Sequence, residues 1–168
     1  MTIPLTTNQD LDSSRLREAF GVFPSGVVAV AALVDDEPVG LAASSFTSVS
    51  LEPPLVSFSV AGTSNTWPTL RRADHLGVTI LADHHGDVCR QLAGPLPDQF
   101  ERLLYSVTKN GALTLDEGVA RFDYTLQDGL EAGDHVIVLL KLHAVEHRSK
   151  SMPLVFHRSG FGRLSGSV

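Results

Sequence analysis

Seven histidines are the residues of this chain best suited to bind a metal ion or to transfer a proton near neutral pH. His84 and His85 are adjacent in a polar turn, and their side chains are expected to point in different directions. His143 and His147 have the spacing of one helix face, but the residues around them follow a strand pattern. The sequence holds no His-Glu-x-x-His motif and no Cys/His cluster, so we expect no metal site.

Nucleophilic catalysis is also disfavoured. Cys89 is the only cysteine, and an adjacent arginine such as Arg90 lowers the pKa of a thiol in general. Cys89 lies, however, in a predicted short helix near Leu92, where we expect a packed and unreactive thiol. A Gly-x-Ser-x-Gly motif on a strand–turn–helix is absent from the sequence, which argues against a serine hydrolase.

Two segments rich in small hydroxyl residues have a pattern that suits ligand binding. Ser44 and Ser45 directly follow an apolar run, beside alanines that would let a ligand approach the backbone. A hydroxyl-rich turn that satisfies its own amides is the alternative. Ser64 and Thr66 precede a predicted short helix, where free amides and hydroxyls bind phosphate. Simple capping of that helix is equally compatible with the pattern.

Two further segments place polar or aromatic residues at strand ends. His135 begins a long apolar run and follows Asp134, in the segment EAGDHVIV. Near the C-terminus, PLVFHRSGFGRL brings aromatic and basic residues together. Taken alone, these patterns are typical of a solvated histidine after a turn and of an edge strand followed by a mobile tail.

Composition limits the classes of function that remain. Hydrophobic residues make up 43% of the 168 residues and charged residues 19%, which is enough for a sizeable core in one domain. A net charge of −6 and a sequence pI near 5.5 argue against a nucleic-acid partner. The longest apolar runs fall far short of the roughly 18 residues of a membrane span, and the N-terminus lacks a signal-peptide pattern. We therefore expect a cytoplasmic protein with no membrane partner.

Short strands dominate the predicted elements. The apolar runs and alternations predict strands at residues 27–34, 39–43, 55–60, 76–81, 119–127, 135–147 and 154–157. Short helices are expected at 13–20, 68–73 and 87–93, a turn at 129–134, and a loop-rich excursion at 95–118. Residues 1–12 are expected to be a flexible tail and 13–168 the domain. Without a Gly-x-Gly-x-x-Gly motif or alternating strands and helices, an antiparallel barrel is favoured over a Rossmann domain.

The order of these segments resembles a known family. FPSGV, GLAASSFTSVSLEPPLVSFSV, S-x-T-W-P-x-L-R, EAGDHVIV and PLVFHRSGFGRL follow one another as in the short-chain NAD(P)H:flavin oxidoreductases. These have a flavin-reductase-like domain with an FMN-binding split barrel and are reductase components of two-component flavin-dependent monooxygenases. The resemblance implies a mainly β fold, a six-stranded antiparallel split β-barrel with short flanking helices, that works as a homodimer.

The resemblance also implies site residues. It implies FMN or FAD as the flavin, NADH or NADPH as the electron donor, and a positioning role for His135 in the hydride transfer. Asn65 stands where many relatives have a basic residue, so Arg71 or helix amides would supply charge for the phosphate. The implied flavin contacts are Pro24, Ser25, Gly26, Ala42, Ala43, Ser44, Ser45, Phe46, Ser59, Ser64, Asn65, Thr66, Arg71 and Thr79. The implied nicotinamide pocket holds His135, Phe156, Arg158 and Phe161.

Two functions follow from the resemblance. The first is a reductase that transfers a hydride from NAD(P)H to FMN or FAD and supplies reduced flavin to a separate monooxygenase. The alternative is a flavin-binding split-barrel protein without reductase turnover, such as a carrier or redox sensor. An oxidase of the pyridoxamine-phosphate type shares the barrel, but this chain lacks that group's phosphate-clamping basic residues in matching places.

Overall fold

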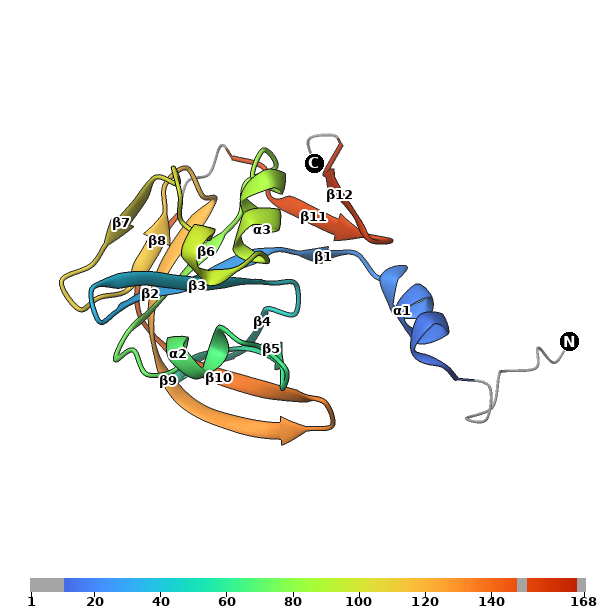
Figure 1. Cartoon of the computed structure of the whole chain (residues 1–168), viewed down its shortest axis with the longest axis horizontal. Coiled ribbons are helices and arrows are strands. Elements are labelled where there is room, and N and C mark those ends of the chain that lie inside the picture. Colours follow the sequence, from blue (N-terminus) through green and yellow to red (C-terminus); the bar gives the residue numbers. More distant parts are fainter. Residues whose placement is uncertain (1–10, 148–150, 166–168) are drawn as a thin grey trace, which may run out of the picture.

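The computed structural model describes residues 11–147 and 151–165, and antiparallel strands form most of it (Figure 1). The helices are α1 (Ser13–Gly21), α2 (Trp67–Leu70) and α3 (Gly86–Leu92), with a short 3₁₀ helix at Leu96–Asp98. None of the helices in the described ranges is long and apolar enough to cross a membrane. The strands are β1 (Ser25–Gly26), β2 (Val28–Val34), β3 (Glu37–Ala43), β4 (Thr47–Leu51), β5 (Pro54–Ala61), β6 (Leu76–Ile80), β7 (Tyr105–Val107), β8 (Leu113–Leu115), β9 (Ala120–Ala132), β10 (His135–His147), β11 (Leu154–His157) and β12 (Gly160–Arg163).

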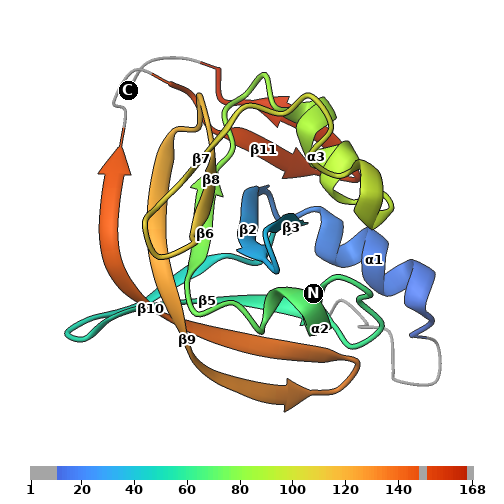
Figure 2. The ribbon, with the colours of Figure 1, turned by 60° about the vertical axis from the view of Figure 1, so that its left-hand side comes forward.

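Seven strands form the central sheet, in the order β3-β2-β6-β9-β10-β5-β4. Long β9 and β10 curve around β2 and β3 (Figure 2). The sheet ends at β3 and β4, and among the described residues no ladder joins these two strands into a closed barrel. The expected mainly β, antiparallel fold with short helices is confirmed, but the expected count of six strands is wrong. The chain passes between the two sheet edges at residues 44–46, so this hydroxyl-rich segment lies where the sheet is split.

The surroundings of strand β2 explain why its sequence is a continuous apolar run. Successive side chains of a strand point to opposite faces, and both faces of β2 are covered. Val28 and Val30 belong to one buried cluster, whereas Ala29 and Ala31 belong to a second one on the other side. The turn after β2 has Asp35 and Asp36 at φ angles of 54° and 65°, which fit a tight hairpin turn.

A second, three-stranded sheet has the order β1-β11-β12, and α1 lies at its end. The predicted helix is confirmed: the Asp12 side chain accepts a hydrogen bond from the Arg15 N–H at 2.8 Å, and the helix ends one residue later than expected. The helix projects away from the central sheet (Figure 1) and buries none of its residues. Most of the expected tail, residues 1–10, lies outside the described residues.

Several elements differ from the sequence-based expectation. No strand was expected between residues 43 and 55, where the structure has β4, and the expected loop-rich excursion at 95–118 contains the β7–β8 hairpin. Strand β12 was not expected at all. Residues 129–132 continue β9, and the turn is confined to Gly133 and Asp134 between β9 and β10. The missed strands are short or polar, and even the buried β8, at three residues, is too short to leave a periodic pattern in the sequence.

Candidate functional site

A pocket of 170 Å³ lies at the end of β3, where several sequence-predicted residues meet. Small-molecule pockets are usually about 300–1,000 Å³, so this pocket holds part of a ligand and the rest must extend over neighbouring surface. Its walls are mostly apolar, which suits the edge of an aromatic ring. The lining residues are Val27, Ala42, Ala43, Ser44, Cys89, Ala93, Phe156 and Phe161.

Phe156 and Phe161 form the aromatic wall of the pocket. They are paired across β11 and β12, with ring centroids 5.6 Å apart and planes tilted by 56°. The Arg90 guanidinium of α3 lies 5.1 Å from the Phe161 ring centroid, a cation–π distance, and also binds Asp87 at 2.6 Å. These contacts fix both the ring and the helix, so the wall is in place before a ligand binds.

The segment around β1 continues this wall. Ser25 is the register partner of Phe156, and Gly26 is the partner of Val155. Pro24 is exposed just before them. A Cβ added at Gly26 would meet no other atom within 4 Å, so the backbone there is open to a ligand.

The hydroxyl-rich turn after β3 divides its side chains between the pocket and the protein. Ser44 is exposed and lines the pocket. The Ser45 hydroxyl accepts a hydrogen bond from the Ser59 N–H at 2.8 Å and donates to the Ser59 carbonyl at 3.2 Å. Phe46 packs on Phe122 with ring centroids 6.3 Å apart, so its ring is partly buried against the core. Ser45 therefore ties the segment between β3 and β4 to strand β5.

The loop that precedes α2 was expected to bind phosphate. The Ser64 hydroxyl accepts a hydrogen bond from the Trp67 N–H at 3.1 Å, so the capping alternative holds for this residue. Capping uses the hydroxyl as an acceptor and leaves its O–H free to donate to an anion. The Thr66 side chain makes no capping bond and Asn65 is exposed. Arg71 follows the last residue of α2, at the opposite end from Ser64.

His135 lies beside this loop rather than in the aromatic pocket. Its Nδ1 is 2.7 Å from Asp134 Oδ1, and the hydrogen bond and charge of His135, followed by the charge of Arg17, lower the pKa of Asp134. The Asp134 carbonyl accepts a hydrogen bond from the Gly62 N–H at 2.8 Å, and His135 is the β-ladder partner of Ala61. Within one chain, the structure thus places His135 next to Ala61 and Gly62, where the loop before α2 begins, and it is not among the residues that line the pocket with Phe156.

Thr79 is not brought to the site. Its side chain is 1% exposed and its hydroxyl accepts a hydrogen bond from the Leu115 N–H at 2.9 Å. Strand β6 is buried on both faces, so its sequence gives no alternation from which the direction of Thr79 can be inferred. The structure directs this residue toward β8.

Three pocket residues were not predicted: Val27, Cys89 and Ala93. The last two are separated by four residues, the spacing that places side chains on one helix face. Burial raises the pKa of the Cys89 thiol against the opposing charge of Arg90, so the expectation of an unreactive thiol is supported. Cys89 thus contributes a small apolar wall.

The expectation that His84 and His85 point apart is wrong. Their ring centroids are 4.2 Å apart, and with Glu117 they offer three ligand atoms within 4.8 Å of one another. The Ala82 N–H, however, donates to His85 Nδ1 at 3.1 Å. In the neutral ring this bond leaves the proton on Nε2, so His85 has no lone pair to spare without losing a buried hydrogen bond.

Comparisons with known proteins show which proteins the chain is similar to. A flavin reductase from Pseudomonas putida is 38% identical over 153 residues, 90% of either chain. The reductase subunit HsaB of a flavin-dependent monooxygenase from Rhodococcus jostii is 30% identical over 151 residues, 90% of this chain and 77% of HsaB. The chain spans only 58% and 53% of two longer relatives from Rhizobium meliloti.

Among solved structures, the NADH:FAD oxidoreductase SgcE6 of Streptomyces globisporus superposes with a TM-score of 0.87 at 29% identity. The match covers 99% of this chain and all of that one. The family model described as the flavin reductase like domain matches residues 20–165, a range that includes the aromatic pocket, the loop before α2 and His135. By this match and by its fold, the chain belongs to the flavin reductase like family.

Proposed function

We propose that the chain is an NAD(P)H-dependent flavin reductase, which transfers a hydride from NADH or NADPH to FMN or FAD and supplies reduced flavin to a separate monooxygenase. The observation that carries this proposal is the pocket at the end of β3, which is lined by small and aromatic side chains. It contains no acid–base pair, and its one thiol has a raised pKa. Hydride transfer between two bound rings needs positioning and exclusion of water, and such a pocket provides both.

The residues of the chain fit the flavin that family membership implies. When bound, the flavin supplies the ring nitrogen that accepts the hydride from the nicotinamide. Phe156 and Phe161 exclude water from one side of the pocket, and the small residues after β3 allow a ring to approach the backbone. The free O–H of Ser64 and the hydroxyl of Thr66, which makes no capping bond, are available to donate to a phosphate.

The partner of the reductase is proposed from the relatives. HsaB is named as the reductase subunit of a flavin-dependent monooxygenase, and this supports a separate oxygenase as the acceptor of reduced flavin here. We further propose that residues 13–168 form the functional domain and that it acts in the cytoplasm as a homodimer. The pocket of 170 Å³, too small for a whole flavin, supports a site that a second copy completes.

The test is anaerobic mixing of the purified protein with NADH or NADPH and excess FMN or FAD. We expect at least one pairing to bleach the visible absorbance band of the flavin within the mixing time of a manual assay. No bleaching with any of the four pairings would contradict the proposal. Tight, stoichiometric retention of flavin with negligible nicotinamide oxidation would instead select the flavin-binding protein without turnover.

The roles of His135 and of the loop before α2 can be distinguished by comparing KM for the pyridine nucleotide with Kd for flavin in variants of each. If His135 positions the nicotinamide, His135→Ala should raise KM for the pyridine nucleotide more than it raises Kd for flavin. Ser64→Ala combined with Thr66→Ala should weaken flavin binding, at about 1.5–3 kcal/mol for each lost hydrogen bond to a phosphate. A larger effect of His135→Ala on flavin binding than on KM would assign His135 to the flavin, as its place at the start of the loop before α2 also permits.

A further inference from the structure

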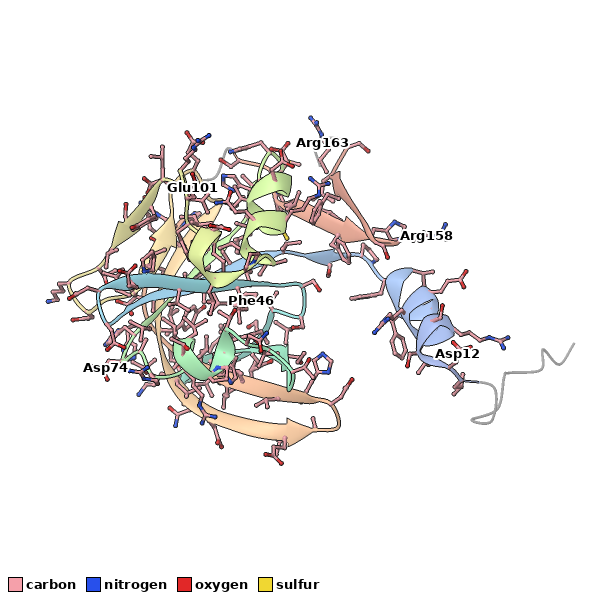
Figure 3. The ribbon with its side chains drawn as sticks, in the orientation of Figure 1. Asp12, Phe46, Asp74, Glu101, Arg158 and Arg163 are labelled. Carbon is pink, nitrogen blue, oxygen red and sulfur yellow. The ribbon has the colours of Figure 1, made fainter. Side chains whose placement is uncertain are left out.

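A second, larger cavity lies between α1 and the turn that joins β11 to β12. Its volume is 540 Å³ and its walls are mainly polar. Arg158 lies on this turn and extends beside the helix (Figure 3). No residue that lines the aromatic pocket also lines this cavity, whereas Arg158, which the resemblance assigns to the nicotinamide pocket, lines this cavity instead. Its lining residues are Ser14, Arg17, Glu18, Gly21, Val22, Arg158 and Ser159.

The helix and the turn are fixed against each other by the backbone. The Arg158 N–H donates a hydrogen bond to the Gly21 carbonyl at 2.8 Å, and a Cβ at Gly21 would lie 3.7 Å from the Arg158 Cα. Residues three and four apart share a helix face, so Arg17 lies on the same face of α1 as Gly21. Arg17 on α1 and Arg158 on the β11–β12 turn therefore line the same cavity.

The charge of the cavity favours an anion. Two arginines and one glutamate line it. Among the residues that the structure describes, neither Arg17 nor Arg158 has an ion-pair partner within 4.0 Å, whereas Arg72, Arg90, Arg102 and Arg121 each have one. A guanidinium binds phosphate oxygens in a bidentate manner. The cavity therefore offers two guanidinium groups that form no close ion pair in the described part of the chain, although the charge of Arg17 also acts on Asp134.

The cavity adjoins the aromatic pocket through one hairpin. Arg158 follows Phe156 by two residues, about 7 Å along an extended strand. In a nicotinamide dinucleotide, one ribose separates the pyridine ring from the first phosphate. A pyridine ring that docks at Phe156 and Phe161 would direct its phosphates toward the turn of the same hairpin.

We propose that Arg17 and Arg158 bind the phosphate groups of the nicotinamide dinucleotide in the cavity between α1 and the β11–β12 turn. This inference rests on the proposed reductase function, since it names the place where the electron donor of that reaction is held. It assigns a donor-binding role to α1, which otherwise buries nothing in the described chain.

The test uses Arg17→Ala, Arg158→Asn and the double variant. Asparagine is chosen at position 158 because φ there is +48°, a conformation that asparagine tolerates better than alanine. Arg15→Ala is the matched control, since Arg15 is an exposed arginine of the same helix that does not line the cavity. Arg17→Lys tests whether charge alone restores binding.

In steady state, the double variant should raise KM for NADH by about tenfold or more, with kcat within about twofold and an unchanged Kd for flavin. Calorimetry with ADP-ribose, which has both bridging phosphates but no nicotinamide, should show the same loss of affinity. Equal losses for NADH and NADPH would assign the site to the pyrophosphate, and a loss confined to NADPH would assign it to the 2′-phosphate.

Two results would overturn the inference: unchanged KM and ADP-ribose affinity in the double variant, or equal losses in Arg15→Ala. The ADP-ribose titration needs no turnover. If the wild-type protein binds ADP-ribose through the two arginines but bleaches no flavin, the reductase function fails while the phosphate site stands.

Discussion

A substitution at Gly26 should affect ligand binding without affecting the stability of the fold. No protein atom lies within 4 Å of the place where a Cβ would stand, although its neighbour Ser25 pairs with Phe156 of the pocket wall. Gly26→Ala should therefore change the free energy of unfolding by less than about 0.5 kcal/mol. If the flavin lies along this backbone, the methyl group should raise the Kd for flavin about tenfold, as fluorescence quenching would measure.

Gly162→Ala is the control for this prediction. Gly162 lies in the same three-stranded sheet and is also open within 4 Å, but it has no predicted flavin contact. Equal effects of both substitutions on flavin binding, or none from Gly26→Ala, would remove β1 from the flavin site.

His85 makes stability depend on pH. Burial, followed by the charge of His84, lowers its pKa below 6.5, although Glu117 and Asp83 oppose this shift. As the pH drops below 6.5, His85 becomes protonated in the unfolded chain while it stays neutral in the native state. The free energy of unfolding should therefore fall as the pH drops from 6.5 toward the pKa of His85 in the native state. For one proton the slope is at most about 1.4 kcal/mol per pH unit.

His85→Asn provides the measurement. The asparagine oxygen can accept the Ala82 N–H in place of Nδ1, but it does not titrate. Urea unfolding at about pH 7.5 and about pH 5.5 should show a smaller loss of stability in the variant than in the wild type. An equal loss in both proteins would mean that other groups cause the acid sensitivity.

At the scale of elements, the contact between β6 and β8 depends on a residue without a side chain. A Cβ at Gly77 would lie 1.9 Å from the Leu113 carbonyl oxygen, so the two strands would have to separate. Gly77→Ala should reduce the free energy of unfolding by about 3 kcal/mol or more, measured by urea denaturation. Gly129→Ala, whose Cβ would meet Val136 at an ordinary 3.5 Å, should change it little. A stable Gly77→Ala protein would contradict the close packing of these strands.

The elements that the sequence predicts well are those that bury a face. Strands β2, β10 and β11 match their predicted ranges within one residue, because apolar runs mark them. Strand β4, with the sequence TSVSL, is almost wholly exposed, and only its pairing with β5 makes it a strand. Residues 129–132 likewise extend β9 through pairing with β10 rather than through burial. Pairing between distant segments leaves little trace in local sequence.

The candidate site likewise has a part that the sequence predicts and a part that arises only from tertiary packing. Motifs in the sequence identify residues 42–44, Phe156 and Phe161, which the structure places around one pocket. The contribution of Cys89 and Ala93 arises only from the packing of α3 against β3 and the β11–β12 hairpin. That His135 lies beside Ala61, where the loop before α2 begins, also follows only from the register of β10 with β5.

At the scale of the whole molecule, the exposed apolar residues bear on the proposed homodimer. Helix α1 and the turn after it expose Phe20 at 71% and Phe23 at 78%, and the β9–β10 hairpin exposes Leu130 at 65%. Apolar surface stabilises association by roughly 25 cal/mol per Å² when it is buried. Both elements extend from the body of the sheet (Figure 1) and can reach a second copy. These surfaces support the proposed homodimer.

Light scattering coupled to gel filtration should therefore give the wild-type protein twice the 18.0 kDa mass of one chain. Phe20→Ser combined with Leu130→Ser should shift the mass toward that of one chain and weaken flavin binding as well, because the pocket of 170 Å³ holds only part of a flavin within one copy. Leu104→Ser removes a leucine that is 73% exposed in the segment before β7 and should alter neither property. A monomeric wild-type protein, or a monomeric variant that binds flavin with full affinity, would show that one chain builds the site alone.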